Sequence, residues 1–414
     1  MMSYRAFEVT GTRRFALVER ELRDPLPGEV RLRVEACGVC HSDTLAVEGM
    51  RADPAVPVVP GHEIVGVLDA VGPGVTAWAP GDHVGVGYLN GHCGQCGNCR
   101  RGDFVNCTDQ PWTGTTTDGG YAEVAYARAT GLVRIPGGAQ PLDVAPLLCA
   151  GLTVYRALLT ADARPGSLVA VQGIGGLGHL GIQYAKTLGY RVAAIARGTG
   201  KAALAADLGA DEYIDSTTTD PGRELTRLGG AAAIIATASS GASMSPLVAG
   251  LATRGQLLVV GAAPDPIEVR TPDLIFGTHS VVGALTGSAI ENEDSVRLAH
   301  DRGIRSRNEI MPLSEAPKAY ERMMSGEARF RVVLDTREWL RSLTRRTAGR
   351  RRCRRSRRSG RCWSSGGRPA RQRRRGRRRD RSATWTAAPP GGPRAGRRAA
   401  SPTGACRRTR RQSG

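Results

Sequence analysis

The chain has 414 residues, a pI near 10.3 and a formal net charge of +20, values that point first to a nucleic-acid-binding protein. The charge is not evenly distributed, however. Residues 341–414 hold 27 Arg, no Lys and a single acid, Asp380, and therefore carry +26, which leaves −6 for residues 1–340. The body of the chain is mildly acidic, and this argues against specific nucleic-acid binding by the body.

Residues 1–20 contain no apolar core of signal-peptide length, and no run of about 18 apolar residues occurs anywhere in the chain. Seven of the ten Cys lie in residues 1–340, and four of these fall between Cys93 and Cys107. Clustered Cys in a chain without a secretion signal favours metal binding over disulfides. We therefore expect a soluble, cytoplasmic protein with no membrane partner.

The first 150 residues predict a compact, barrel-like β region. Short alternating runs, such as residues 29–36 and 81–89, are separated by turn residues about every eight to twelve positions. From Pro141 onward the pattern changes to the spacing of apolar residues that is typical of a helix.

A regular alternation of strand and helix follows this region. Apolar strands at 167–173 and 191–197 are each followed by a helical pattern, at 177–189 and 201–209. Further short strands are predicted at 211–216, 232–238, 256–261 and 279–285. Strands that alternate with helices indicate a parallel, doubly wound sheet. Two helices around 295–303 and 315–326 and a strand at 328–335 then complete the fold.

The segment after residue 340 has the composition of a disordered tail. It holds one Leu, Leu343, and no Val, Ile, Phe, Tyr or Met, so it cannot bury enough apolar surface to offset its chain entropy. Dense Arg could bind nucleic acid nonspecifically. A segment made largely of Arg, Gly, Ala, Ser and Pro also fits translation of GC-rich DNA in an unintended frame, and we rank that interpretation first.

The strongest chemical signal is the segment 93–107. It supplies four thiols from one loop, those of Cys93, Cys96, Cys99 and Cys107. Four Cys closing a tetrahedral zinc ion form the usual structural zinc site. An iron–sulfur cluster is the alternative, and four unliganded thiols are disfavoured because exposed thiols oxidise. We expect a structural zinc.

Three dispersed motifs, CGVCHSD at 37–43, GHE at 61–63 and LLCAG at 147–151, accompany this loop. Together they resemble the zinc-dependent alcohol dehydrogenases of the medium-chain dehydrogenase/reductase family, over about residues 4–335. The resemblance implies a catalytic zinc bound by Cys40, His62 and Cys149, with its fourth position open to water or alcohol.

Two carboxylates in the same motifs also have counterparts in the family. Glu63 corresponds to the carboxylate that lies behind the catalytic zinc and coordinates it transiently. Asp43 corresponds to the acid that orients His62 through its other ring nitrogen. Cys37 has no family role, and we interpret it as a buried core residue.

The resemblance also implies the α/β fold class and the division into domains. Residues 1–150 would form a GroES-like β-barrel catalytic domain with a structural zinc lobe, completed by residues 287–340. Residues 151–286 would form a Rossmann domain, a doubly wound parallel sheet that binds NAD(P). Residues 341–414 would be the disordered Arg-rich tail.

A glycine-rich motif predicts the coenzyme site. Gly173, Gly175 and Gly178 follow a predicted strand and open a helix, so they permit the tight turn and the close approach of pyrophosphate to the helix N-terminus. The predicted site comprises these glycines with Gly176 and Leu177. The resemblance adds contacts from His41 and Arg331 to the coenzyme phosphates and from Thr153 to the nicotinamide, although His41 and Arg331 could also be ordinary surface charges.

The end of the second strand bears on the choice between NAD and NADP. An NAD enzyme usually has Asp or Glu there, to bind the ribose 2′-hydroxyl. This chain has Ala196 and Arg197, and Arg197 with Lys201 could pair with a 2′-phosphate. We favour NADP, although Ala196 also permits NAD.

In the family, aromatic residues line the substrate pocket at the positions of Tyr88 and Trp112, although simple loop packing explains Trp112 equally well. The resemblance implies reversible oxidation of a primary alcohol to an aldehyde, by hydride transfer to NAD(P) beside a zinc that lowers the pKa of the alcohol. Ser42 would be the first proton acceptor. Leu45 stands where many members have a His, so the outer step of the proton relay lacks that side chain.

A homodimer or homotetramer is also implied by the resemblance. Two other functional classes stay open at this point. One is a nonspecific nucleic-acid-binding protein that acts through the basic tail. The other is a quinone-reductase-like relative without zinc, which the presence of all seven ligand-type Cys and His residues disfavours.

Overall fold

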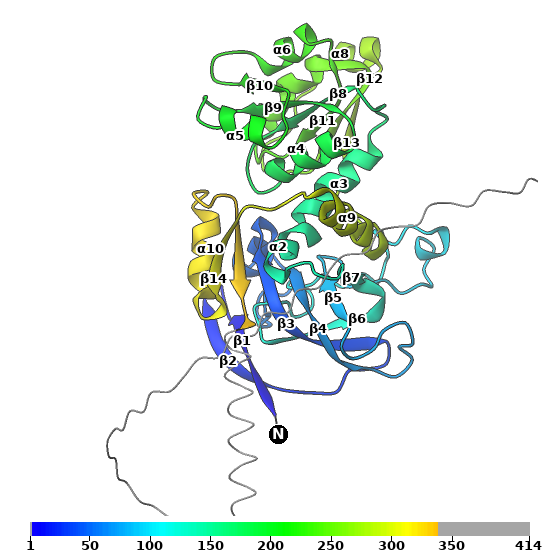
Figure 1. The fold of residues 1–414 in the computed structure, drawn as a ribbon, viewed down its shortest axis with the longest axis vertical. Helices are drawn as coiled ribbons and strands as arrows, with labels where there is room; N and C mark the ends of the chain where they lie inside the picture. Colours follow the sequence, from blue (N-terminus) through cyan, green and yellow to red (C-terminus); the bar gives the residue numbers. More distant parts are fainter. Residues whose placement is uncertain (1, 338–414) are drawn as a thin grey trace, which may run out of the picture. The chain divides into compact units, whose positions relative to one another are not determined.

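The computed structural model describes residues 2–337, which all belong to one compact unit of the chain. The predicted disordered tail and its nucleic-acid-binding alternative lie outside the described residues. Two large sheets dominate the structure, a mixed sheet built mainly from the first third of the chain and a parallel sheet from the middle (Figure 1). The two sheets confirm the predicted α/β fold class.

The mixed sheet has seven strands in the order β14-β15-β3-β4-β5-β7, with β6 also paired to β3. A separate antiparallel hairpin, β1 (Ser3–Val9) and β2 (Phe15–Glu21), lies beside it. The seven strands are β3 (Glu29–Val39), β4 (Glu63–Val71), β5 (His83–Val86), β6 (Val124–Arg128), β7 (Leu132–Arg134), β14 (Asn308–Pro312) and β15 (Arg331–Asp335). Neighbouring strands are antiparallel except for β14 and β15.

Alternation along β3 fixes which side chains enter the core. Val30, Leu32 and Val34 are fully buried, whereas the Arg residues between them are not, as expected for a strand with one covered face. From the far end of the chain, α10 (Ala316–Met324) packs beside the β1–β2 hairpin (Figure 1). The Phe15 and Tyr320 ring centroids are 5.8 Å apart.

The sequence pattern from Pro141 forms three short elements rather than one long helix. These are α2 (Pro141–Val144), the 3-10 turn η4 (Ala145–Leu148) and α3 (Ala150–Thr160). Cys149, with φ −125° and ψ −69°, breaks the helical path between η4 and α3. No single helix of residues 2–337 is long and apolar enough to cross a membrane, although Pro141–Leu148 with Ala150–Thr160, bent by 47°, passes that test as a pair.

The parallel sheet has six strands in the order β10-β9-β8-β11-β12-β13, which is the strand order of a Rossmann domain. β8 (Leu168–Gln172) is buried at every residue, because a parallel sheet is covered on both faces. The other strands are β9 (Arg191–Ala196), β10 (Glu212–Asp215), β11 (Ala231–Ala236), β12 (Leu251–Val259) and β13 (Ser280–Gly283).

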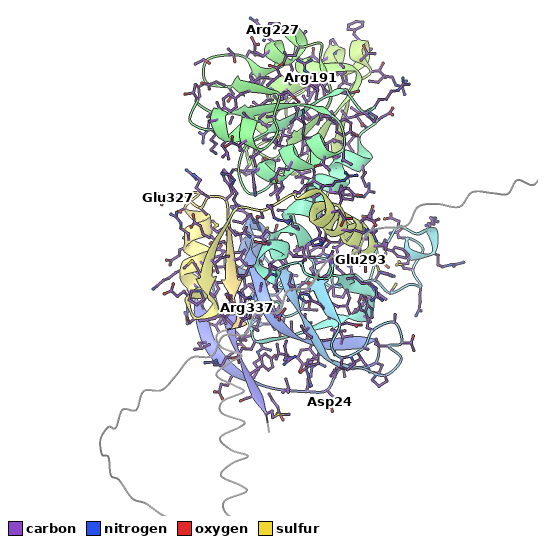
Figure 2. All side chains as sticks on the ribbon, in the orientation of Figure 1. Asp24, Arg191, Arg227, Glu293, Glu327 and Arg337 are labelled. Carbon is purple, nitrogen blue, oxygen red and sulfur yellow. The ribbon has the colours of Figure 1, made fainter. Side chains whose placement is uncertain are left out.

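Helices connect these strands and return the chain to the mixed sheet. They are α4 (Gly178–Thr187), α5 (Ala202–Asp207), α6 (Pro221–Arg227), α7 (Gly241–Met244), η5 (Ser245–Gly250), α8 (Thr271–Gly277) and α9 (Ala289–Arg302). The remaining short elements are η1 (His41–Asp43), α1 (Thr44–Val47), η2 (Cys99–Arg101), η3 (Ala129–Gly131) and η6 (Leu313–Glu315). Charged side chains such as Asp24, Arg227 and Glu327 are exposed on the outside of these elements (Figure 2).

Candidate active site

Three strand ends meet at the first cluster of ligand-type residues. Cys40 directly follows β3, and His62 directly precedes β4. Because β3 and β4 are antiparallel, with Gly38 opposite Glu63, the end of one strand meets the start of the other. β15 pairs with β3 on its other side, so its first residue, Arg331, also reaches this point.

Cys149 completes the cluster from the break before α3. The ligand atoms of Cys40, His62, Glu63 and Cys149 all lie within 4.8 Å of one another. The Cys40 and Cys149 Sγ atoms are 3.9 Å apart, and zinc–sulfur bonds of about 2.3 Å in a tetrahedron place two sulfurs about 3.8 Å apart. His62 Nε2 and Glu63 Oε2 are buried and have no hydrogen-bond partner among the described residues. This donor set therefore fits zinc.

The protonation of the two thiols also suits a cation. The hydrogen bond with Cys149 holds the pKa of the Cys40 thiol well below its usual value, and the same bond raises the pKa of Cys149. Zinc binds thiolates and releases a thiol proton when it binds.

Asp43 fixes the direction of the ligands. Its Oδ1 lies 2.9 Å from His62 Nδ1, so the opposite ring nitrogen, Nε2, is the one that faces the sulfurs. Its Oδ2 accepts the backbone N–H of Cys40 at 2.9 Å and the hydroxyl of Tyr121, also at 2.9 Å. Tyr121 is fully buried, and sequence reasoning missed it.

Glu63 forms a buried ion pair with Arg331. Burial raises the pKa of Glu63 to about 8, against the opposing effect of the Arg331 charge. A Cβ at Gly38 would lie 1.8 Å from Glu63 Oε2, so glycine is required beside this carboxylate. Arg331 also borders the glycine-rich turn, because a Cβ at Gly176 would lie 3.1 Å from its Nη1.

The glycine-rich turn connects β8 to α4, as predicted. Gly173 has φ +88°, a conformation that favours glycine, and a Cβ at Gly178 would lie only 1.7 Å from the Gly173 oxygen. A Cβ at Gly175 would meet no atom of residues 2–337 within 4 Å. The turn is therefore tightly packed at Gly178 and open at Gly175, where a ligand could approach the backbone. Leu177 is the N-cap of α4.

The predicted determinants of coenzyme choice lie at the end of β9. Arg197 is exposed, and Lys201 Nζ donates to the carbonyl of Ile174 at 2.7 Å. Sequence reasoning found no carboxylate along this strand, but it missed Asp215 at the end of the neighbouring strand β10. Asp215 pairs in register with Ala196, and its Oδ1 accepts the Gly198 N–H at 2.8 Å.

The other predicted residues lie around the Cys40 cluster. Ser42 is half-buried within η1, and Leu45 is half-buried in α1. His41 is exposed. Thr153 is buried in the first turn of α3, and its N–H donates to the Cys149 carbonyl at 2.9 Å. Cys37 is fully buried, as interpreted from the sequence.

An aromatic ladder leads from the cluster toward the surface. The Tyr88 ring meets the His62 ring edge-on, with centroids 5.1 Å apart, and stacks on Trp112 at 5.9 Å. Trp112 is 41% exposed, so the ladder ends at solvent. The two predicted substrate residues are therefore in contact with each other, and Tyr88 is in contact with a predicted metal ligand.

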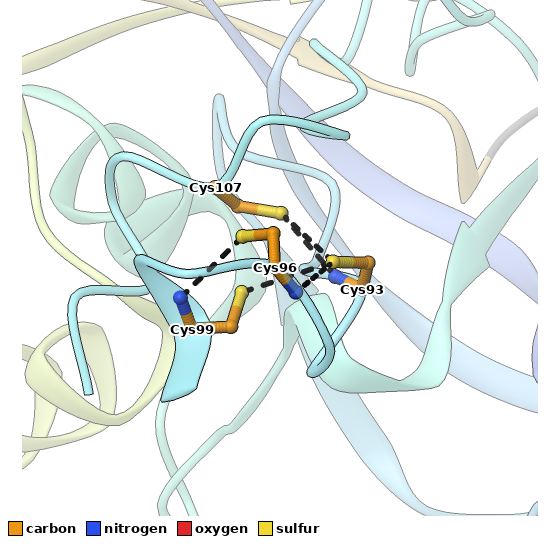
Figure 3. A group of neighbouring side chains, drawn as sticks. All are labelled: Cys93, Cys96, Cys99 and Cys107. Atoms are coloured by element: carbon orange, nitrogen blue, oxygen red, sulfur yellow. Dashed lines mark hydrogen bonds between the residues drawn. The ribbon is translucent and has the colours of Figure 1, made fainter. Parts of the chain in front are cut away.

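The second cluster is the four-Cys loop. The Sγ atoms of Cys93, Cys96, Cys99 and Cys107 lie within 4.8 Å of one another and point toward a common centre (Figure 3). Cys93 Sγ is 4.0 Å from that of Cys99 and 3.6 Å from that of Cys107. Backbone N–H groups point at the sulfurs, and the N–H of Cys99 is the main cause that lowers the pKa of Cys96 to about 5. Four thiols with these separations fit a closed zinc site.

Comparison with known proteins agrees with both clusters. The model of the alcohol dehydrogenase GroES-like domain matches residues 26–137, and that of the zinc-binding dehydrogenases matches residues 176–301. The chain is 45% identical over 314 residues to alcohol dehydrogenase notN of an Aspergillus species, covering 76% of this chain and 92% of the relative. It is 37% identical over 309 residues to an alcohol dehydrogenase of Geobacillus stearothermophilus, covering 74% of this chain and 92% of the relative.

The structure resembles a cobalt- and zinc-bound thermostable alcohol dehydrogenase from Pyrobaculum aerophilum, with a TM-score of 0.72 and 29% identity over 81% of this chain and all of that one. The chain belongs to the zinc-containing medium-chain alcohol dehydrogenase family. It is an NAD(P)-dependent zinc alcohol dehydrogenase with a structural four-Cys site and a catalytic Cys/His/Glu site. The alternative of a relative without zinc is therefore wrong.

Proposed function

We propose that the enzyme oxidises primary alcohols reversibly to aldehydes. The observation that carries this proposal is the contact of Tyr88 with His62, because it sets an aromatic wall directly beside the catalytic ligands. Trp112 extends the wall outward through its stacking on Tyr88. An aromatic wall beside these ligands would favour a carbon with one substituent over a carbon with two.

Once bound, zinc supplies a Lewis acid that lowers the pKa of an alcohol hydroxyl, and the nicotinamide coenzyme supplies the hydride acceptor. Cys40, His62 and Cys149 would hold the metal, and Glu63 would lie behind it. Asp43 keeps His62 in one tautomer, which fixes the direction of its Nε2.

The proton released from the alcohol needs an acceptor in the chain. Ser42 lies between Cys40 and Asp43, and its hydroxyl oxygen would accept the proton beside the metal. Leu45, in the next turn, carries no titratable group and cannot pass the proton onward. We infer that the proton leaves Ser42 through the coenzyme ribose and water.

We further propose that the coenzyme pyrophosphate binds at the Gly173–Gly178 turn, with His41 and Arg331 as cations for its phosphates and Thr153 beside the nicotinamide. Arg197 and Lys201 favour the extra phosphate of NADP, whereas Asp215, paired with Ala196, opposes it. Two cations face one carboxylate, that of Asp215, and its Oδ1 already accepts hydrogen bonds. The balance of charge therefore favours NADP.

A substrate panel tests both proposals in one experiment. Matched primary and secondary alcohols, and the corresponding aldehydes and ketones, are assayed with NAD(H) and with NADP(H). We expect kcat/KM to be higher for each primary alcohol than for its secondary isomer, and to be higher with NADP than with NAD. Preference for secondary alcohols would overturn the substrate proposal, and a hundredfold preference for NAD would overturn the coenzyme proposal.

We propose that the enzyme is a homo-oligomer built on a dimer through the edge of the Rossmann sheet. Among the described strands, β13 pairs only with β12, so its other edge offers unpaired backbone groups. Large apolar side chains gather around it, with exposed fractions of 69% for Ile275, 88% for Phe276, 40% for Val281 and 59% for Leu285. A second copy related by a twofold axis would cover this edge with an identical strand.

A further inference from the structure

His179 is a fully buried imidazole with no part in the chemistry described above. It is the second residue of α4, directly after the glycine-rich turn. Its Nδ1 lies 2.8 Å from the carbonyl oxygen of Gly175, and its Nε2 accepts the backbone N–H of Arg307 at 3.3 Å. Its ring stacks on Phe330, with centroids 5.0 Å apart. Three segments distant in sequence therefore meet at this one side chain.

The two hydrogen bonds determine the form of the ring. Burial lowers the pKa of His179 to about 4, so the imidazole is neutral near pH 7. A neutral imidazole has one N–H donor and one acceptor nitrogen. Since a carbonyl only accepts and a backbone N–H only donates, Nδ1 carries the proton and Nε2 does not. His179 therefore links two segments in one direction only: its Nδ1–H donates to the turn, and its Nε2 accepts from the Arg307 N–H.

The bond to Gly175 orients more than one atom of the turn. The Gly175 oxygen accepts both Nδ1–H and the backbone N–H of His179, the latter at 3.2 Å. In a planar trans peptide, the carbonyl of Gly175 and the N–H of Gly176 point in opposite directions. Holding the carbonyl toward α4 therefore turns the Gly176 N–H toward the open side of the turn. Backbone N–H groups at such a helix N-terminus are the usual donors to a pyrophosphate.

The contact with Phe330 connects the same ring to the catalytic site. Phe330 immediately precedes Arg331, which pairs with Glu63 and borders Gly176. His179 thus packs between the turn and the start of the strand that delivers Arg331. A change in the position of its ring would move the Gly175–Gly176 peptide and the Phe330–Arg331 backbone together.

We infer that His179 is a positioning residue for coenzyme binding, which holds the Gly175–Gly176 peptide with its N–H directed at the pyrophosphate. The inference rests on the proposed binding of the coenzyme at this turn. It assigns the ring no contact with coenzyme or substrate.

Two amide substitutions separate the two hydrogen bonds of the ring. In His179→Asn the side-chain NH2 replaces Nδ1 and keeps the donor to Gly175. In His179→Gln the longer amide reaches the position of Nε2, where its oxygen keeps the acceptor for Arg307 but the donor to Gly175 is lost. The matched control is Gln183→Ala, one turn further along α4. Gln183 also ties α4 to the same segment, through the Arg305 N–H and the Arg305 carbonyl, both at 3.0 Å. Its Nε2 also donates to the His179 backbone carbonyl at 2.8 Å, but it makes no hydrogen bond to Gly175.

For each zinc-loaded, full-length variant, the dissociation constants of NADH and NADPH are measured by nicotinamide fluorescence. The midpoint of thermal unfolding is measured on the same protein. We expect His179→Gln to weaken binding of both coenzymes about five- to tenfold, the scale of one lost hydrogen bond. His179→Asn should bind within about twofold of the parent, and Gln183→Ala should lower the midpoint without weakening binding. The inference is overturned if Asn and Gln weaken binding equally, if neither does, or if Gln183→Ala weakens it as much as His179→Gln.

A further variant separates failure of this inference from failure of the proposed coenzyme site. Gly175→Val adds a side chain in open space, so it should leave the fold intact while blocking the approach of pyrophosphate. If Gly175→Val leaves coenzyme binding unchanged, the turn is not the site and both proposals fall. If Gly175→Val weakens binding but His179→Gln does not, the site stands and the role of His179 is refuted.

Discussion

At the residue scale, the catalytic ligands are held in place by residues that are not themselves metal ligands. Asp43 accepts hydrogen bonds from the Cys40 backbone and from Tyr121, and its other oxygen lies 2.9 Å from His62 Nδ1, so one carboxylate contacts both ligands. Gly38 leaves room for Glu63 where a Cβ would clash. Substitution of a ligand therefore removes metal binding without removing the groups that shape the site.

The first prediction concerns these ligands. Cys40→Ser and His62→Ala should lower turnover by at least about a thousandfold, because they remove donors from the metal on which alcohol ionisation depends. Both variants should stay folded, because the Tyr121–Asp43 contact and the surrounding core remain. The measurement is steady-state turnover together with circular dichroism.

The matched control is Cys37→Ala, three residues away on β3. It removes a buried thiol that lies outside the group of ligand atoms and bonds only weakly to the Gly38 carbonyl, at 3.5 Å, so it should cost about 1 kcal/mol of stability and retain turnover. Equal loss of turnover in Cys37→Ala and Cys40→Ser would contradict the assignment of Cys40 as a ligand.

Several site residues could be predicted from the sequence, and others could not. Cys40, His62 and Glu63 stand in short motifs, and the clustering of their ligand atoms with that of Cys149 agrees with the predicted metal site. Tyr121 reaches Asp43 from a segment about eighty residues away, where no local pattern marks it. Asp215 was missed for a related reason, since only strand pairing puts it beside Ala196.

At the element scale, the four-Cys loop shows how little apolar packing a metal site needs. Between β5 and β6 the only helix-like element is the three-residue turn η2 (Cys99–Arg101). Cys93 and Cys96 are only partly buried, and the nearby contact of His92 with Phe104 is a small stack, with centroids 4.1 Å apart. The loop therefore depends on its zinc for a defined structure.

The second prediction follows from this dependence. Cys96→Ser should lower the thermal midpoint by roughly 5 °C or more and reduce the soluble yield, because a closed zinc site contributes folding free energy directly. Arg100→Ala, in the same turn, changes an exposed residue and should leave the midpoint unchanged. The measurement is thermal unfolding of both variants. A Cys96→Ser protein as stable as the parent would show that this site is not structural.

The elements themselves were predicted unevenly. The strands and helices from 167 to 216 follow strong alternation, and the structure has β8, α4, β9, α5 and β10 there. The pattern from Pro141 predicted helical structure but not the break at Cys149, because apolar spacing continues across the break. α6, α7 and α8 are short, so the repeat of apolar residues along each of them is too short to predict a helix.

At the scale of the whole molecule, one apolar core joins the two sheets. It runs from Ala36 and Val65 of the mixed sheet through α3 to Val169 and Val171 of the parallel sheet. Order along the chain does not reveal this continuity. The exposed apolar side chains around β13 are not part of this core, and their exposure is the basis for the proposed dimer.

The third prediction tests that dimer. The mass of the parent enzyme in solution should be that of two or more chains of 43.8 kDa each. Val281→Lys should shift the enzyme to a smaller species, because a charge cannot be buried at the paired edge. The measurement is light scattering coupled to size-exclusion chromatography. Exposed Ile310, on β14, gives a control in Ile310→Lys, which should not change the mass. A monomeric parent would refute the proposal.

The central claim is that this chain holds two zinc ions with different roles and works as an NAD(P)-linked alcohol dehydrogenase. The most direct test is zinc content per chain by mass spectrometry, measured on the same fully active preparation as turnover with a primary alcohol. The account predicts two zinc ions per chain, one in Cys40→Ser or Cys149→Ser, and turnover only where both are present. Fully active enzyme with one zinc or none would contradict it.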